Sequence, residues 1–144
     1  MLENLTSTKA PASVVPIRLA VGAIFLSEGI QKFLFPGLLG VGRFIKIGIP
    51  APAFMAPFAG IFEISCGTLV LIGLLTRLAA IPLIITMLVA ITTTKIPIFL
   101  KSGFWAMAHE ARTDFAMLLG CLFLLIAGAG TWSLDANSRL KKRV

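Results

Sequence analysis

The sequence predicts an all-α, polytopic membrane protein that folds as an antiparallel bundle of four transmembrane helices. Hydrophobic residues make up 58% of the chain and charged residues only 13%, whereas soluble domains are about half apolar and a quarter charged. The mean hydropathy of +0.98 agrees. Four apolar runs each approach the roughly 20 residues that cross a bilayer. The expected membrane domain is 14–135, with spans at about 14–35, 53–75, 78–100 and 115–132.

The first expected span follows a polar N-terminal tail, residues 1–13. This tail carries Glu3 and lacks the basic start of a signal peptide, so we expect the span at 14–35 to be retained. Pro36 and the glycine after it end this helix, because proline lacks an N–H and glycine is flexible. The loop 36–52 is apolar and glycine-rich, which predicts a segment lying along the membrane interface or dipping into it.

The remaining spans alternate with short connections. A very short turn separates 53–75 from 78–100, which predicts antiparallel neighbouring helices. A polar loop is expected at 101–114, before the last span at 115–132. The basic tail 136–144 ends in RLKKRV, which is typical of a membrane-flanking anchor.

The distribution of lysine and arginine predicts that both termini are cytoplasmic in a plasma (inner) membrane. With that orientation, six of these residues lie inside and four outside, in agreement with the excess of positive charge in cytoplasmic loops. The net charge of +7 does not indicate nucleic-acid binding, because the basic residues do not form a patch with aromatic residues. The expected surroundings are therefore the lipid bilayer.

Ionisable residues inside apolar spans are the main functional signal, because placing a charge there costs a few kcal/mol. Glu28 and Lys32 are one helical turn apart, so we expect them to pair on a buried face. Glu63 lies about midway along its span and is the best candidate for a functional residue. Lys95 and Asp114 lie at the same predicted depth as the first pair.

Together these residues predict an inward-facing polar cavity that opens to the outer side. Phe25 and Phe33 would line its apolar part. Structural alternatives remain open: Lys32 could reach the headgroups with its long stem, and Asp114 could cap the last helix. Arg18 is interpreted as an anchor near the cytoplasmic surface.

Other site chemistries receive little support. Cys66 and Cys121 are weak redox candidates, because no C-x-x-C motif is present and buried single cysteines are more often packing residues. His109 is the only histidine, and HEAR is not the zinc-binding H-E-x-x-H, so no metal site is predicted.

Three segments resemble the DoxX family of small four-helix membrane proteins: RLAVGAIFLSEGIQKF, FEISCGTLVLIGLLTRLAA and RTDFAMLLGCLFLLIAGAGTWSLD. The resemblance covers roughly residues 17–135 in the family's order. It implies a four-helix bundle in a prokaryotic plasma membrane and an association with respiratory or thiol redox systems, often as an accessory subunit. The recurrent family positions that match are Lys32, Glu63, Gly67, Arg77 and Asp135.

The leading functional hypothesis is a redox-associated subunit whose buried polar pocket binds a quinone or another amphipathic small molecule. Glu63 would accept a proton or a hydrogen bond, and Glu28 and Lys32 would polarise the outer part of the pocket. A second hypothesis is a proton- or ion-coupled transporter that acts as a homo-oligomer. A third is a scaffold whose polar stripe binds another membrane or redox protein.

Overall fold

A computed structural model describes residues 10–140, and all secondary structure in this range is helical, without strands. Three helical segments are long and apolar enough to cross a membrane: Ala12–Leu34, Pro52–Ile72 and Thr76–Ala127. The all-α prediction is therefore confirmed. The elements are η1 (Ala12–Val14), α2 (Val15–Leu34), α3 (Val41–Lys46), α4 (Pro52–Ile72), α5 (Thr76–Ala90), the π-helix η2 (Ile91–Lys95), α6 (Ile96–Ala127) and α7 (Leu134–Leu140).

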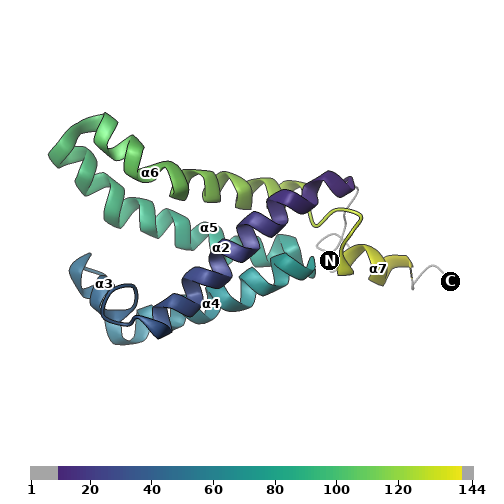
Figure 1. The fold of residues 1–144 in the computed structure, drawn as a ribbon, viewed down its shortest axis with the longest axis horizontal. Helices are drawn as coiled ribbons and strands as arrows, with labels where there is room; N and C mark the ends of the chain where they lie inside the picture. Colours follow the sequence, from purple (N-terminus) through teal and green to yellow (C-terminus); the bar gives the residue numbers. More distant parts are fainter. Residues whose placement is uncertain (1–9, 141–144) are drawn as a thin grey trace.

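The third apolar segment folds back on itself. Its 52 residues far exceed the roughly 20 that a bilayer requires. Within α6, Gly103 has φ 81° and ψ 179°, a conformation that glycine adopts readily because it has no Cβ. The chain reverses there, and the rest of α6 returns alongside α5 (Figure 1). The stretch 101–114, which was expected to be a loop, is therefore helical apart from this one residue.

The apolar loop between α2 and α4 also contains a helix, the short α3. Phe44 of α3 is buried and the neighbouring Ile45 is 63% exposed, so the helix has one face against the protein. It packs on α4 at the end of the molecule where the chain also turns back between α5 and the rest of α6 (Figure 1). This end is called the open end below.

Glycines bring α2 and α4 into direct backbone contact. A Cβ added to Gly29 would lie 2.8 Å from the carbonyl oxygen of Gly60, and one on Gly67 would lie 2.8 Å from the amide nitrogen of Leu26. Only glycine permits this approach, as in other tightly packed membrane helices. The packing makes α2 and α4 one unit, and α5 with α6 a second one that diverges from it toward the open end (Figure 1).

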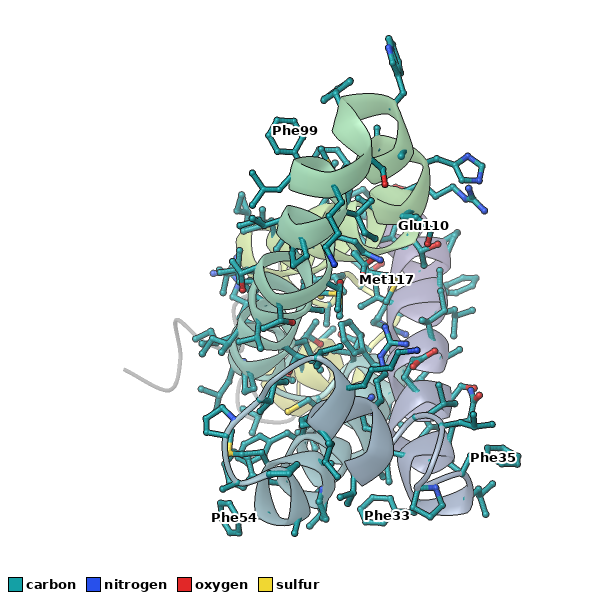
Figure 2. All side chains as sticks on the ribbon, turned by 90° about the vertical axis from the view of Figure 1, so that its left-hand side faces the viewer. Phe33, Phe35, Phe54, Phe99, Glu110 and Met117 are labelled. Atoms are coloured by element: carbon teal, nitrogen blue, oxygen red, sulfur yellow. The ribbon has the colours of Figure 1, made fainter. Side chains whose placement is uncertain are left out.

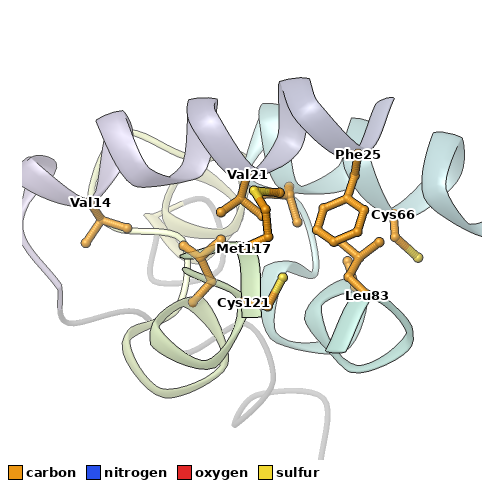
Figure 3. Close-up of a cluster of buried hydrophobic side chains, with 10 residues drawn as sticks. Val14, Val21, Phe25, Cys66, Leu83, Met117 and Cys121 are labelled. Atoms are coloured by element: carbon orange, nitrogen blue, oxygen red, sulfur yellow. The ribbon is translucent and has the colours of Figure 1, made fainter. Parts of the chain in front are cut away.

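The two helix pairs meet in a hydrophobic core away from the open end. Phe25 and Val21 of α2 pack in one cluster with Leu83 of α5 and with Cys121 of α6 (Figure 3). Cys66 belongs to the same cluster, and both thiols are buried and free. Both cysteines are therefore packed among apolar side chains of the core.

Buried charges organise the opposite end, called the closed end, where α7 lies. Asp135 is 2% exposed, and its two carboxylate oxygens accept hydrogen bonds from the amides of Leu75 (2.9 Å) and Thr76 (3.3 Å), at the start of α5. Arg18 is 6% exposed and donates from Nη1 to the carbonyl of Ala129 over 2.7 Å. The interpretation of Arg18 as a surface anchor is wrong, because its guanidinium satisfies a buried carbonyl instead.

Candidate functional site

A half-open cavity of about 700 Å³ lies between the two helix pairs. Residues of α2, α3 and α4 form one side, and residues of α5, η2 and α6 form the other. Figure 2 looks into the molecule from the open end, where Met117 points toward the space between the pairs. Phe25, only 1% exposed, belongs to the inner wall, and exposed Glu28 belongs to the rim.

The first charged feature of the cavity is an ion pair between α2 and α4. Lys32 Nζ lies 2.6 Å from Glu63 Oε2, and the two side chains are 11% and 3% exposed. Glu28 Oε2 lies 4.0 Å from the same Nζ, and its side chain is 51% exposed. The expected Glu28–Lys32 pair is therefore the weaker contact, because the closely packed helices bring Glu63 to Lys32. The mid-span acid is paired and faces the cavity.

The second charged feature joins η2 to α6. Lys95 Nζ lies 3.0 Å from Asp114 Oδ2, with side-chain exposures of 11% and 21%. Asp114 does not cap a helix, because it lies inside α6 rather than at its start. Lys95 ends the π-helix, a local widening of the helix that is often found at functional sites.

Threonines stabilise this π-helix. The hydroxyls of Thr93 and Thr94 donate to the carbonyls of Val89 (2.7 Å) and Ala90 (2.6 Å), one turn earlier. These bonds provide partners for carbonyls where the regular helical pattern is interrupted. The interruption helps to determine which side of the helix presents Lys95 to the cavity.

Six of the seven residues expected at the site line this one cavity: Phe25, Glu28, Lys32, Glu63, Lys95 and Asp114. The exception is Phe33, which is 47% exposed, points outward in Figure 2 and lies against Gly60 instead. Its position follows from the helix, because Phe33 is 80° from Phe25 at 100° per residue. Sequence reasoning missed Arg43 and Glu110, which also line the cavity.

The cavity combines opposite charges with apolar walls. Three basic and four acidic side chains line it: Lys32, Arg43 and Lys95, with Glu28, Glu63, Glu110 and Asp114. Between them lie aromatic and aliphatic side chains, including Phe58, Phe62 and Ile85. Each lysine ammonium has three N–H donors, and neither is saturated: Lys95 donates to Asp114, and Lys32 donates to Glu63 and, over 3.5 Å, to the main-chain carbonyl of Glu28. Such a site can hold a small molecule that has both polar acceptors and an apolar body.

Metal chemistry finds no support in residues 10–140. No group of three or more histidine, cysteine, aspartate or glutamate side chains in this range could hold a metal ion. Carboxylates in the cavity are instead matched by lysines, at least in the two pairs described above.

These features define a helical membrane protein with a charged cavity between two helix pairs. The family model of DoxX matches residues 13–96, and the chain belongs to the DoxX family. It is 57% identical to the "Uncharacterized membrane protein Rv3486" of Mycobacterium tuberculosis (strain ATCC 25618 / H37Rv), over 97% of this chain and 88% of that protein. It is 33% identical to the "Putative oxidoreductase CatD" of Bacillus subtilis (strain 168), over 83% and 81%. No solved structure matches the chain.

Proposed function

We propose that this protein is a redox-associated membrane subunit that binds a quinone or another amphipathic small molecule between its helix pairs. One observation carries the proposal: two acid–base pairs face a single cavity with largely apolar walls. Charges at this depth are costly in a membrane protein and usually mark functional sites. The name of the Bacillus subtilis relative, "Putative oxidoreductase CatD", favours redox chemistry over other uses.

The cavity residues fit a quinone head group. Lys32 on α2 and Lys95 on η2 would each donate a hydrogen bond to an oxygen of the ring. Lys32 keeps one N–H beside its bonds to Glu63 and to the carbonyl of Glu28, and Lys95 keeps two beside its bond to Asp114. Phe25 and Met117 would contact the apolar part of the ligand. A bound quinone would supply two-electron, two-proton redox chemistry.

The acidic side chains would bind and release protons near the ligand. Glu63 is 3% exposed and bonded to Lys32, which in turn lies 4.0 Å from the half-exposed Glu28. This series of side chains leads from the rim of the cavity to its interior. Glu63 would hold or release a proton, and Glu28 would exchange one with water.

The membrane arrangement is part of the proposal. The 52-residue segment Thr76–Ala127 would cross the bilayer twice, with its reversal at Gly103 near one surface. The protein would then be an antiparallel four-helix bundle in the plasma membrane, with both termini cytoplasmic and the cavity open to the outer side. The electron donor or acceptor would be another membrane or redox protein.

Ligand binding is tested by thermal unfolding of the purified protein in detergent, with and without a short-chain ubiquinone. Wild type should be stabilised by several degrees at saturating ligand, because a ligand that binds only the native state raises its stability. The double variant Lys32→Gln, Glu63→Gln should lose most of that shift, since two amides replace the ion pair at similar volume. Lys101→Gln, an exposed residue outside the cavity, is the matched control.

Two outcomes would contradict the proposal: no stabilisation of wild type, or an equal shift in the double variant. Transport remains the second candidate, because Glu28, Lys32 and Glu63 form a charged route into the protein. Uptake of protons into proteoliposomes, driven by a pH gradient and lost in Glu63→Gln, would favour transport over ligand binding.

A further inference from the structure

A second hollow lies beside the cavity, between α3 and the π-helix region. It is a groove of about 570 Å³, lined on the α3 side by Arg43 and Lys46 and on the other by Thr93, Thr94 and Pro97. Arg43, Thr93 and Thr94 also line the cavity, so the two hollows share a wall. The groove is therefore the neighbour of the cavity at the open end.

The groove carries positive charge without a matching acid. Arg43 and Lys46 are three residues apart on α3, and residues at this spacing lie on the same side of a helix. Both are exposed, and the lining of the groove includes no aspartate or glutamate. Lys32 and Lys95 form ion pairs nearby, whereas neither Arg43 nor Lys46 forms one within the part of the chain that the structure describes. The groove thus presents two available cations.

The surroundings of the groove are apolar and exposed. Leu38, which lines it, is 76% exposed, and Ile45 on α3 is 63% exposed. Leu100, beyond Pro97 in α6, is 76% exposed. A short helix that combines basic side chains with exposed aliphatic ones is typical of a segment lying in the membrane interface.

We propose that this groove binds an anionic phospholipid, with the phosphate between Arg43 and Lys46 and the acyl chains along Leu38 and Ile47. The two cations complement the phosphate charge, and guanidinium and ammonium groups both bind phosphate oxygens well. The exposed aliphatic side chains favour a lipid over a water-soluble phosphate, because they would otherwise contact water at the interface. The positive charge of the groove and the apolar side chains around it thus both favour an anionic lipid as the occupant.

The threonines add a preference among headgroups. Thr93 and Thr94 donate their hydroxyl hydrogens to helix carbonyls, so toward a ligand in the groove their oxygens act as acceptors. A glycerol headgroup has hydroxyl donors for these oxygens, whereas a choline headgroup has none. Phosphatidylglycerol therefore matches the groove better than phosphatidylcholine in both charge and hydrogen bonding.

The site does not depend on the proposed quinone function, although Arg43 connects the two hollows. A lipid in the groove would lie at the rim of the cavity, with its phosphate held by a residue of the cavity wall. The cavity would then be bordered by lipid on the α3 side.

Native mass spectrometry of the purified protein, titrated with phosphatidylglycerol or phosphatidylcholine, tests the proposal. Wild type should bind one phosphatidylglycerol in preference to phosphatidylcholine. Arg43→Gln with Lys46→Gln should weaken that binding by roughly tenfold or more, since each cation near an anionic headgroup contributes a several-fold factor. The charge-preserving Arg43→Lys should retain most of the affinity.

The matched control removes two other charges at the open end, Lys101→Gln with Arg112→Gln, and should bind phosphatidylglycerol like wild type. Equal losses in the two double variants would overturn the proposal, because the effect would then come from net charge. Equal binding of both lipids, or displacement of the lipid by millimolar inorganic phosphate, would overturn it as well. Thermal unfolding of each variant shows that the fold is retained, and the quinone shift is measured separately.

Discussion

The closed and open ends of the molecule use buried charges in different ways. At the closed end, Asp135 and Arg18 form hydrogen bonds with main-chain amides and a carbonyl. At the open end, Lys32 and Lys95 form ion pairs with Glu63 and Asp114 beside a cavity. The first arrangement satisfies backbone groups that a membrane cannot, and the second leaves donors and acceptors next to accessible volume.

The difference shows how stability and binding are divided within one small chain. Asp135 joins α7 to the start of α5, and Arg18 joins α2 to the segment after α6, so the closed end connects elements distant in sequence. The two ion pairs each lie within one helix pair: Lys32–Glu63 joins α2 to α4, and Lys95–Asp114 joins η2 to α6. Neither ion pair bridges the space between the helix pairs. A ligand can therefore occupy that space without breaking either.

The largest effect is expected at the closed end, from Asp135→Ala. The variant should lose about 3 kcal/mol of unfolding free energy, because one buried and one partly buried amide lose a charged acceptor. This corresponds to a fall in melting temperature of roughly 10 °C for a chain of this size. Thermal unfolding in detergent measures it, with the exposed Asn137→Ala as the control.

Asp135→Asn sharpens this result, because the amide keeps one oxygen acceptor and should recover about half of the lost stability. Melting temperatures of Asp135→Ala within a degree or two of wild type would mean that the closed end is not held by this side chain.

A comparable but non-additive effect is expected for the buried pair of the open end. Glu63→Leu or Lys32→Met alone should each cost up to about 3 kcal/mol, because the partner charge is left buried. The double variant should return to within about 1 kcal/mol of wild type, since no charge then remains unpaired. A double-mutant cycle from reversible unfolding measures the coupling.

Additive losses in that cycle would contradict the proposed difference between the two ends. They would show that each side chain stabilises the fold through contacts other than the ion pair. Ligand stabilisation should be absent from the double variant even where its own stability is restored. Stability and binding would then be separated in a single protein.

The smallest effect is expected for the second pair. Asp114→Asn should change the unfolding free energy by about 1–2 kcal/mol, because Asp114 is 21% exposed against 3% for Glu63 and water can replace part of the lost partner of buried Lys95. The quinone-induced shift should nevertheless decrease, since Lys95 loses the partner that orients it. A change in stability as large as that of Asp135→Ala would place this pair with the closed end instead.

The sequence indicated which charged residues line the cavity better than it indicated which of them form ion pairs with one another. Glu63 was identifiable because a mid-span acid is costly in a membrane. The pairing of Lys32 was not, because a local spacing favoured Glu28, whereas the closer partner depends on how near α2 approaches α4. That approach is set by Gly29 and Gly60, which the pattern placed on inward faces without fixing their distance.

The helix boundaries show a similar limit. Polar residues at 101–114 indicated a loop, but the described chain continues as a helix on both sides of Gly103. A glycine with a positive φ reverses the chain in one residue, and no composition pattern distinguishes it from an ordinary helical glycine. The short α3 was missed because six residues are too few to show a helical period.

The reversal at Gly103 and the ion pair between the two arms of this hairpin together fix how the arms are rotated relative to each other. Lys95 and Asp114 stand on opposite arms, and their 3.0 Å contact requires both arms to face each other in one rotational setting. Inserting or deleting a single residue on either arm would turn that arm by about 100°, and one of the two partners would face lipid. Length in this segment is therefore as tightly constrained as side-chain identity, although most of this apolar segment is not buried within the protein.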